Sequence, residues 1–203
     1  MQSTPAVIVV DMVNDNVHGP EHAFIASAAR ALIPGINRLL EAAHERGWTV
    51  VFAGDSFRRD DFYFTGIAAG AAPREGLRGS RLKPHAIEGT RGAEVVAELR
   101  RDTRDLVLPK RRMSAFFGTG LERTLRAGGV DTVLVCGIAT PFCVLTTTLD
   151  ALCHDFRAVI VEDCCAAARP GEHEAVLGCY RSSALHPLLR VLPLDEALEA
   201  ALQ

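Results

Sequence analysis

TVLVCGI, at residues 132–138, is a short apolar run that a helical pattern follows from residue 140 to residue 154. A run of this length, bounded by a turn, is typical of a strand that is buried on both faces of a parallel sheet. Similar runs precede or follow helical patterns elsewhere in the chain. They are PAVIVV at residues 5–10, WTVVFA at 48–53, DLVL at 105–108, AVIVE at 158–162 and LRVL at 189–192.

Apolar residues at helical spacing predict the helices between these strands. The predicted helices cover residues 22–47, 92–101, 119–127, 140–154, 172–182 and a segment from about residue 194. Pro34-Gly35 interrupts the first helix, which leaves open either two helices or one kinked helix. Residues 55–88 lack a periodic pattern, and we expect a long loop there with a functional or mobile role.

Strands that alternate with helices indicate βαβ units with right-handed crossovers. The sequence therefore predicts an α/β fold: a doubly wound, mostly parallel, six-stranded sheet in a three-layer α/β/α sandwich. No linker or internal repeat interrupts the pattern, so we expect residues 1–203 to form a single domain.

The composition is that of an ordinary globular protein, with 48% hydrophobic and 23% charged residues and a net charge of −3. No basic block is present, so we expect neither nucleic acid nor a membrane surface as a partner. We expect a cytoplasmic protein, because no signal peptide or membrane-spanning apolar run is found. The six cysteines lack paired spacing and are predicted to be free thiols: Cys136, Cys143, Cys153, Cys164, Cys165 and Cys179.

Charged and nucleophilic residues follow several of the predicted strands. In a doubly wound sheet, ligands bind outside the carboxyl ends of the strands. Asp11, Asp55 and Lys110 each follow a strand, and residues 137–143 join the TVLVCGI strand to the next helix. We therefore expect two carboxylates, an ammonium group and the thiol of Cys143 to meet at one edge of the sheet.

Cys143 is the candidate nucleophile of this edge. Thr140 is expected to cap the following helix and Pro141 to begin it, which places Cys143 in the first helical turn. The positive helix end and a nearby ammonium should lower the pKa of the thiol, and the free N–H groups can hold an oxyanion. The alternative is a buried structural cysteine, which is the usual role of a free cysteine.

Asp11 and Lys110 are the candidate partners of the thiol. Near a thiol, Asp11 would take the proton and later give it to a departing amine. Lys110 would hold the thiolate and orient the carboxylate. The alternatives are an aspartate that caps a helix or forms an ion pair, and a solvated lysine.

Four groups of residues, in the same order along the chain, resemble the isochorismatase-like cysteine hydrolase superfamily. They are Ile8-Val9-Val10-Asp11-Met12 with Asn14-Asp15; Glu88-Gly89-Thr90 with Gly92-Ala93-Glu94; Pro109-Lys110 with Ser114-Ala115-Phe116; and Gly137-Ile138-Ala139-Thr140 with Cys143-Val144 and Thr147. Each group is weak evidence by itself, whereas all four in order within a βαβ pattern are strong evidence.

The resemblance implies a catalytic triad of Asp11, Lys110 and Cys143. It also implies a cis peptide between Ile138 and Ala139, and an oxyanion hole formed by the backbone N–H groups of Ala139 and Cys143. The implied reaction hydrolyses an amide-type small molecule through a thioester, without a cofactor. Since members of this family are commonly oligomers, the resemblance further implies a homodimer or homotetramer.

Departures from the family pattern narrow the expected activity. True isochorismatases lack the nucleophilic cysteine, so Cys143 favours hydrolysis of an amide, ureido or lactam C–N bond. Nicotinamidases carry a metal-binding Asp-x-His after the second strand, where this chain reads Asp55-Ser56-Phe57, so we expect no bound metal. The family's Gln two residues after Asp11 is Val13 here. A nicotinamidase-like amidase and a catalytically silent binding module on the same fold remain the alternatives.

Three residues are candidate walls of the substrate pocket. Phe57 and Arg58 begin an aromatic and arginine-rich stretch at residues 57–64 that could roof the site, and an arginine there could bind a carboxylate. Phe116 lies shortly after Lys110. The alternatives are a solvated surface loop for residues 57–64 and core packing for Phe116.

Overall fold

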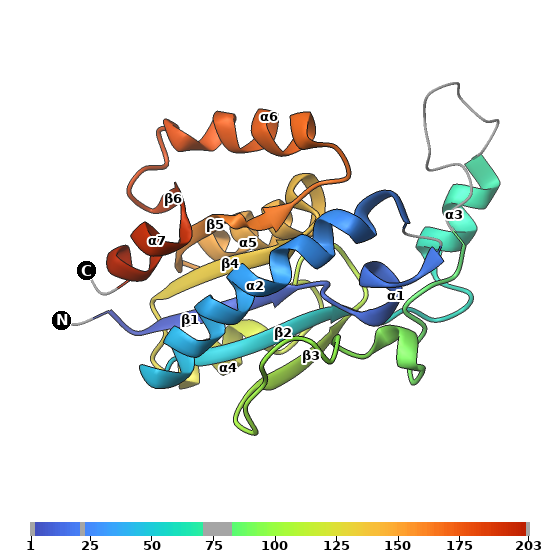
Figure 1. Cartoon of the computed structure of the whole chain (residues 1–203), viewed down its shortest axis with the longest axis horizontal. Helices are drawn as coiled ribbons and strands as arrows, with labels where there is room; N and C mark the ends of the chain where they lie inside the picture. The colour runs from blue at the N-terminus through green and yellow to red at the C-terminus, as the bar shows by residue number, and fades with distance from the viewer. Residues whose placement is uncertain (1–2, 21–22, 71–82, 202–203) are drawn as a thin grey trace.

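A six-stranded parallel sheet forms the centre of the protein, in the order β3-β2-β1-β4-β5-β6 (Figure 1). The computed structural model describes residues 3–20, 23–70 and 83–201. The strands are β1 (Pro5–Val10), β2 (Thr49–Asp55), β3 (Leu106–Lys110), β4 (Thr132–Ile138), β5 (Arg157–Ala166) and β6 (Leu189–Leu192). This architecture confirms the predicted doubly wound α/β fold.

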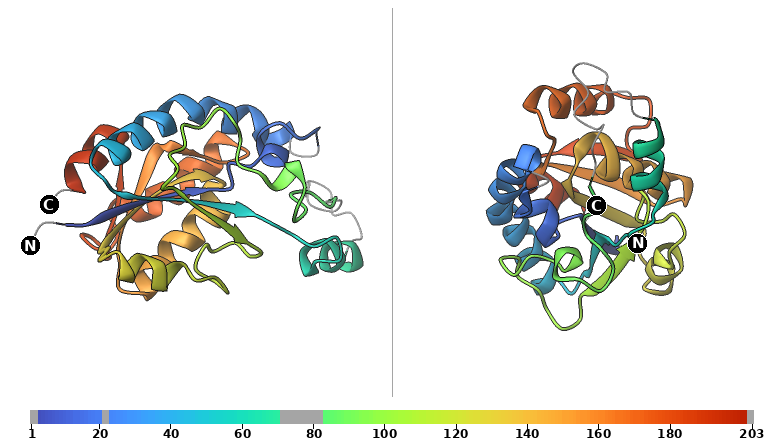
Figure 2. Two further views of the ribbon diagram at one scale, coloured as in Figure 1. Left: turned by 90° about the horizontal axis from the view of Figure 1, so that it is seen from below. Right: turned by 90° about the vertical axis from the view of Figure 1, so that its right-hand side faces the viewer.

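Helices cover both faces of the sheet, with α2 and α7 on one face and α4 and α5 on the other (Figure 2). The α-helices are α1 (Asn14–Val17), α2 (Ala23–Glu45), α3 (Phe62–Gly70), α4 (Leu121–Ala127), α5 (Leu145–Cys153), α6 (Pro170–Arg181) and α7 (Leu194–Ala200). Two shorter turns are η3 (Arg91–Ala93) and η4 (Thr140–Val144). Because both faces are covered, the central strands β1 and β4 are buried along their whole length.

Pro34-Gly35 does not divide the helix that it interrupts, since α2 is one continuous helix with Pro34 inside it. Its buried residues lie on both sides of the proline: Ile25, Ala26, Ala29, Leu32, Ile36, Leu39, Leu40 and Ala43. Gly35 lets this helix approach β5 closely, because a Cβ at Gly35 would lie 3.2 Å from Cys164 Sγ. Packing on the sheet therefore outweighs the hydrogen bond that proline removes.

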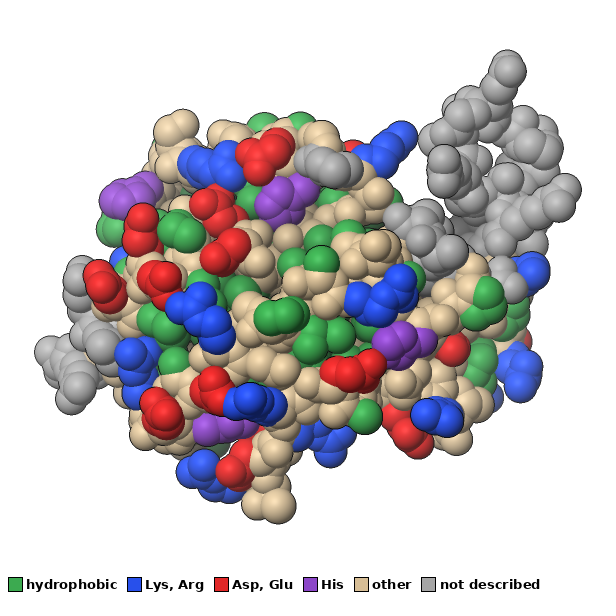
Figure 3. Space-filling model, viewed as in Figure 1, with side chains coloured by type: hydrophobic (Ala, Val, Ile, Leu, Met, Phe, Trp, Pro, Cys, Tyr) green, Lys and Arg blue, Asp and Glu red, His purple; other side chains and the backbone are tan. Residues whose placement is uncertain are grey.

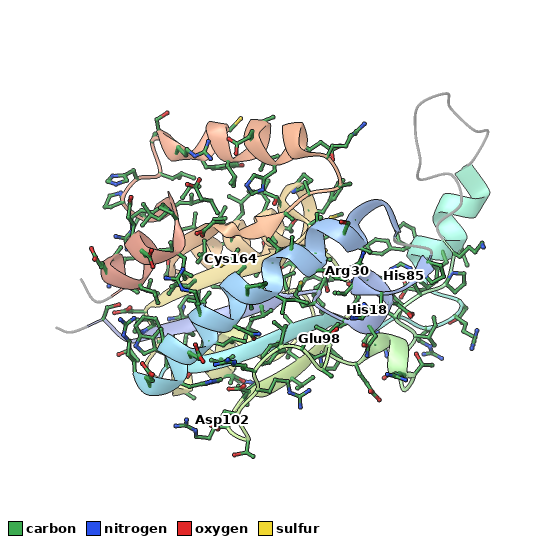
Figure 4. The ribbon with its side chains drawn as sticks, viewed as in Figure 1. His18, Arg30, His85, Glu98, Asp102 and Cys164 are labelled. Carbon is green, nitrogen blue, oxygen red and sulfur yellow. The ribbon has the colours of Figure 1, made fainter. Side chains whose placement is uncertain are left out.

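The predicted helix at residues 92–101 is wrong, since η3 is the only helical turn found there. This segment instead forms hydrogen bonds with the turn after β1, where Val96 N–H donates to Met12 O and Asn14 N–H donates to Glu94 O. A contact of 2.8 Å between His18 Nε2 and Glu98 Oε1 adds to this pairing, and Arg30 of α2 donates to Val17 O next to His18 (Figure 4). Pairing with residues 12–14 satisfies the backbone groups that a helix would otherwise pair internally.

The predicted loop at residues 55–88 contains α3, which its lack of apolar periodicity did not reveal. Residues 71–82 of that loop lie outside the described residues. On the face shown in Figure 3, acidic and basic side chains are interspersed. In the described part of the chain, no helix combines the length and the apolar character needed to cross a membrane.

Gly137, at the end of β4, is required by a close approach between two strands. Its φ is 107°, and a Cβ there would lie 2.1 Å from Val10 O of β1. We predict that Gly137→Ala lowers the free energy of unfolding by about 3 kcal/mol or more, because strain and steric overlap act together.

The matched control is Gly178→Ala in α6, where an added Cβ meets no atom within 4 Å. That substitution should raise the free energy of unfolding by about 0.5–1 kcal/mol. Urea denaturation of both variants measures the difference. Equal stabilities would contradict the steric role of Gly137.

Candidate active site

The carboxyl ends of β1, β2, β3 and β4 bring together the four residues that the sequence placed at one edge. Lys110 Nζ lies 2.8 Å from Asp11 Oδ2, 2.7 Å from Asp55 Oδ1 and 3.5 Å from Cys143 Sγ. One carboxylate oxygen of Asp11, one of Asp55 and the sulfur of Cys143 all lie within 4.8 Å of one another. The arrangement is therefore a compact cluster of two carboxylates, one ammonium group and one thiol.

Lys110 is the centre of this cluster and is fully buried. Asp55 and Lys110 are the last residues of β2 and β3 and are directly paired in the sheet register. Pro109 is tolerated beside them because β3 is an edge strand. Burial disfavours the charged form of Lys110, but the charges of Asp11 and Asp55 outweigh burial and raise the pKa of the ammonium. The group is thus a permanent cation.

Asp11 is held in a left-handed backbone conformation, with a φ of 56°. Aspartate tolerates this region better than most residues, and such conformations gather at functional sites. Its Oδ1 accepts a hydrogen bond of 2.8 Å from Asp55 N–H, while Oδ2 contacts Lys110. Burial and the charge of Asp55 raise the pKa of Asp11 to about 7, although Lys110 and a hydrogen bond from Cys143 act in the opposite sense.

The expectation of a lowered pKa for Cys143 is wrong for this arrangement. Burial and the charge of Asp11 raise the pKa of the thiol well above its ordinary value, and Lys110 offsets this only in part. Burial is the larger cause, because a thiolate enclosed by the protein loses its hydration. A thiolate would also lie close to the carboxylate of Asp11, so the proton rests on sulfur.

Cys143 lies in a π-helical turn, η4, rather than in the first turn of a regular α-helix. Ala139 precedes this turn as its cap residue, and Thr140 makes no capping hydrogen bond. The buried Thr140 hydroxyl instead pairs with His173 Nδ1 of α6 at 2.9 Å. The predicted capping role of Thr140 is therefore wrong, and its side chain connects η4 to α6.

The peptide between Ile138 and Ala139 is cis, at the position that the resemblance implies. Phe142 N–H and Val144 N–H both donate to Ala139 O, which fixes η4 against the end of β4. Among the described residues, none accepts a hydrogen bond from Ala139 N–H. A free N–H group at the start of the turn that carries the thiol is the feature that an oxyanion hole needs.

Two of the sequence motifs serve to position the site. Asn14 Nδ2 donates to Arg91 O and Glu94 O, and Asp15 Oδ2 accepts from Ala86 N–H. Further along, Thr147 Oγ1 of α5 accepts from Ala115 N–H at 3.0 Å. These contacts hold the segments after β1 and β3 in place and explain why those residue types occur together.

The three predicted pocket residues do not join the cluster. Phe57 is buried in a separate aromatic cluster with Phe64 and His85, and Arg58 is exposed and pairs with Asp60 at 3.7 Å. Phe116 packs in the core against His154 and Phe156, with ring centroids 5.2 Å and 6.0 Å apart. Phe116 therefore takes the alternative role of core packing that the sequence left open.

Two residues near the cluster, Asn16 and Arg112, were not identified from the sequence, and a third, Tyr63, lies in the stretch at residues 57–64 that was expected to roof the site. Asn16 is buried and donates to Asp11 O, and its Oδ1 has no partner among the described residues. Burial raises the pKa of the Tyr63 phenol of α3. Tyr63 is also close enough to Cys143 that a negative charge on the sulfur would raise this pKa further. Arg112 stacks on Tyr63, and its backbone oxygen accepts from Lys110 Nζ. These residues follow no periodic pattern that a sequence reading detects.

The donor set of the cluster does not suit a zinc ion. Asp11, Asp55 and Cys143 have the chemistry of metal ligands, but the ammonium of Lys110 lies among them at ion-pair distance. Phe57 stands at the position of the histidine in the Asp-x-His of nicotinamidases, and it packs among aromatic rings. A second cation beside Lys110 would meet strong repulsion.

Comparison with known proteins gives a family match over most of the chain. The model of the isochorismatase domain matches residues 5–188. The ureidoacrylate amidohydrolase of Variovorax paradoxus is 32% identical, over 79% of this chain and 68% of that protein. A probable inactive nicotinamidase of Arabidopsis thaliana is 31% identical, over 84% of each chain.

Among solved structures, the N-carbamoylsarcosine amidase of Thermoplasma acidophilum is similar to this chain. It superimposes with a TM-score of 0.75 and 31% identity, covering 95% of this chain and 97% of that one. Two of these three relatives are named as hydrolases of non-peptide C–N bonds, and the third is named as inactive.

The raised pKa of Cys143 predicts a specific pH dependence of its alkylation. In the unmodified protein, labelling by iodoacetamide should rise with pH to a midpoint above that of an ordinary thiol. Asp11→Asn removes a nearby negative charge and should lower the midpoint by about one pH unit or more. Mass spectrometry of the Cys143 peptide measures the rate, with the exposed Cys153 as internal reference. An unchanged midpoint in Asp11→Asn would contradict this electrostatic account.

The buried position of Lys110 predicts a pH-dependent loss of stability on its removal. Lys110→Met leaves two buried carboxylates without their cation and should cost about 3–5 kcal/mol at pH 8. The loss should shrink towards pH 5, because Asp11, whose folded-state pKa is raised, can then bind a proton and reduce the buried negative charge. Urea denaturation at both pH values is the test, with the exposed neighbour Arg111→Met as a control expected to have little effect. A loss that does not vary with pH would contradict the charge argument.

Proposed function

The chain belongs to the isochorismatase family, and we propose that it is a cysteine-dependent hydrolase that cleaves a C–N bond of a small molecule through a thioester. The observation that carries this proposal is the contact of one buried ammonium with Asp11, Asp55 and the Cys143 sulfur. A nucleophile, a proton acceptor and a group that orients both are the parts that covalent catalysis requires.

In the first step, the Cys143 sulfur attacks the carbonyl carbon of the substrate. The thiol proton passes to Asp11, whose pKa of about 7 suits a group that must accept and release a proton near neutral pH. Transfer to Asp11 removes one negative charge as the thiolate forms, so the net charge of the cluster does not change. This coupling supports attack by a cysteine whose own pKa is raised.

The developing oxyanion is held by the N–H groups of Ala139 and Cys143. Asp11 then gives its proton to the nitrogen, the C–N bond breaks, and the amine or ammonia leaves. Asp11, again a carboxylate, takes a proton from water as the water attacks the thioester. The acid product departs and the proton returns to the Cys143 sulfur, which restores the starting state.

Amides and ureido compounds are the proposed substrate class. The similar amidohydrolases from Variovorax and Thermoplasma are named for ureidoacrylate and N-carbamoylsarcosine, which are both ureido compounds. Asn16 adds a structural argument, because its buried Oδ1 has no partner in the described part of the chain and can accept from a donor such as a substrate N–H.

Two other functions make different predictions. A nicotinamidase-like enzyme would hydrolyse nicotinamide, although Phe57 stands at the position of the metal-binding histidine. A silent binding module is favoured by one observation, namely the relative that is named as inactive. It would form no acyl-enzyme with any amide.

An ammonia-release screen over amides, ureido compounds, lactams and nicotinamide tests the proposed activity. We predict turnover of at least one ureido or open-chain amide compound, and a loss of at least about 10³-fold in Cys143→Ala. Cys153→Ala, which changes an exposed cysteine, should retain full turnover. Intact mass spectrometry of rapidly quenched samples should show an acyl adduct on Cys143.

Full turnover by Cys143→Ala would overturn the mechanism. Turnover of nicotinamide with no ureido or open-chain amide activity would favour the nicotinamidase alternative. Absence of turnover and of an acyl adduct across the whole panel would favour the silent module.

A further inference from the structure

We propose that Arg112 and Tyr63 form a carboxylate subsite beside Cys143, so that the substrates of this site are amides that carry a carboxylate group. This inference rests on the proposed function and specifies its substrate class. Arg112 and Tyr63 come from different segments, the turn after β3 and the helix α3.

Arg112 is attached directly to the catalytic cluster through its backbone. Its carbonyl oxygen accepts a hydrogen bond of 3.2 Å from Lys110 Nζ, the same atom that contacts Cys143 Sγ. The guanidinium lies 5.1 Å from the ring centroid of Tyr63 and 5.9 Å from that of Phe62. The position of Arg112 is therefore fixed relative to the nucleophile by its backbone and by its side chain.

One side of the guanidinium is already paired, and the other side is available. Nη1 donates to both carboxylate oxygens of the buried Asp61, at 3.2 Å and 3.3 Å, and also to Arg111 O. Among the described residues, Nε and Nη2 have no partner, and about a third of the side chain is exposed. Asp61 thus holds the guanidinium in place, and the Nε–Nη2 edge can bind a carboxylate with two parallel hydrogen bonds.

Tyr63 supplies a second donor at the same place. Its phenol is partly buried, and burial raises its pKa, so it keeps its proton at neutral and mildly alkaline pH. A protonated phenol donates to a carboxylate oxygen. The ring also supports the guanidinium, which limits the conformations that Arg112 adopts before binding.

The charge of the cluster makes such a subsite necessary for an anionic substrate. When Asp11 is ionised, Asp11, Asp55 and Lys110 together carry a charge of −1, which repels an approaching carboxylate. Two neighbouring arginines already have carboxylate partners, since Arg111 pairs with Glu88 and Arg58 pairs with Asp60. Arg112 is held by Asp61 and keeps an edge that has no partner among the described residues, so it is the cation suited to offset this repulsion.

Protection of Cys143 from iodoacetamide tests the subsite without requiring turnover. Succinate supplies the carboxylate, and its neutral counterpart succinamide supplies the same carbon skeleton. At pH 9 and constant ionic strength, succinate should slow labelling of Cys143 in the unmodified protein and in Arg111→Gln. Arg112→Gln should raise the half-protecting succinate concentration at least about tenfold and leave the effect of succinamide unchanged. Tyr63→Phe should raise it by a smaller factor.

Because Arg112→Gln leaves the buried Asp61 without its cation, Arg112→Gln with Asp61→Asn is the second variant, and it should show the same loss of protection. Thermal unfolding of each variant establishes that it is folded. Equal protection by succinate and succinamide, or protection by succinate that survives loss of Arg112, would overturn the inference. Failure of the proposed hydrolase function would appear separately, as turnover that does not depend on Cys143.

Discussion

The structure of the site depends on one buried cation placed between two carboxylates. Lys110 is fully buried, and a buried ammonium is strongly disfavoured unless charged partners surround it. Asp55 is supplied by the neighbouring strand in direct register, and Asp11 reaches the same nitrogen from β1 through a left-handed backbone. The alignment of three strand ends is therefore tied to the pairing of one charge.

The same charges determine the resting state of the nucleophile. Burial disfavours a thiolate at Cys143, and the carboxylates of Asp11 and Asp55 add to that effect, whereas Lys110 offsets it only in part. The thiol therefore keeps its proton, and burial together with the charge of Asp55 makes Asp11 a base with a pKa of about 7. Reactivity then depends on transfer of the proton within the cluster when a substrate carbonyl is present. This arrangement therefore does not require a thiolate in the absence of substrate.

The sequence predicted the parts of this protein that follow from periodicity and from the geometry of parallel sheets. The strands, their order of alternation with helices and the convergence of Asp11, Lys110 and Cys143 at one edge could all be derived from apolar runs and the residues that end them. The predictions that concerned unpatterned segments were less accurate. Residues 92–101 pair with the turn after β1 because of long-range hydrogen bonds, and Phe116 packs against His154 and Phe156. Whether the pKa of Cys143 is raised or lowered depends on its burial and on the charges within a few ångströms of the sulfur. A pattern of residues along the sequence does not contain this information.

The residues that the sequence predicted are the ones that we assign to the reaction, whereas the residues that we assign to substrate recognition lie in segments without a periodic pattern. The reacting groups stand at the ends of strands or in the turn that follows β4, where the sheet fixes their positions. The residues that we assign to recognition, Tyr63 and Arg112, stand on a short helix and a turn, and they are held there by side-chain contacts with Asp61 and with each other. Such segments tolerate substitution more readily than buried strands do. A family that keeps one reacting cluster can therefore serve amidohydrolases of different substrates, since a change in these surface segments alters what is bound without moving the sulfur, the carboxylates or the ammonium.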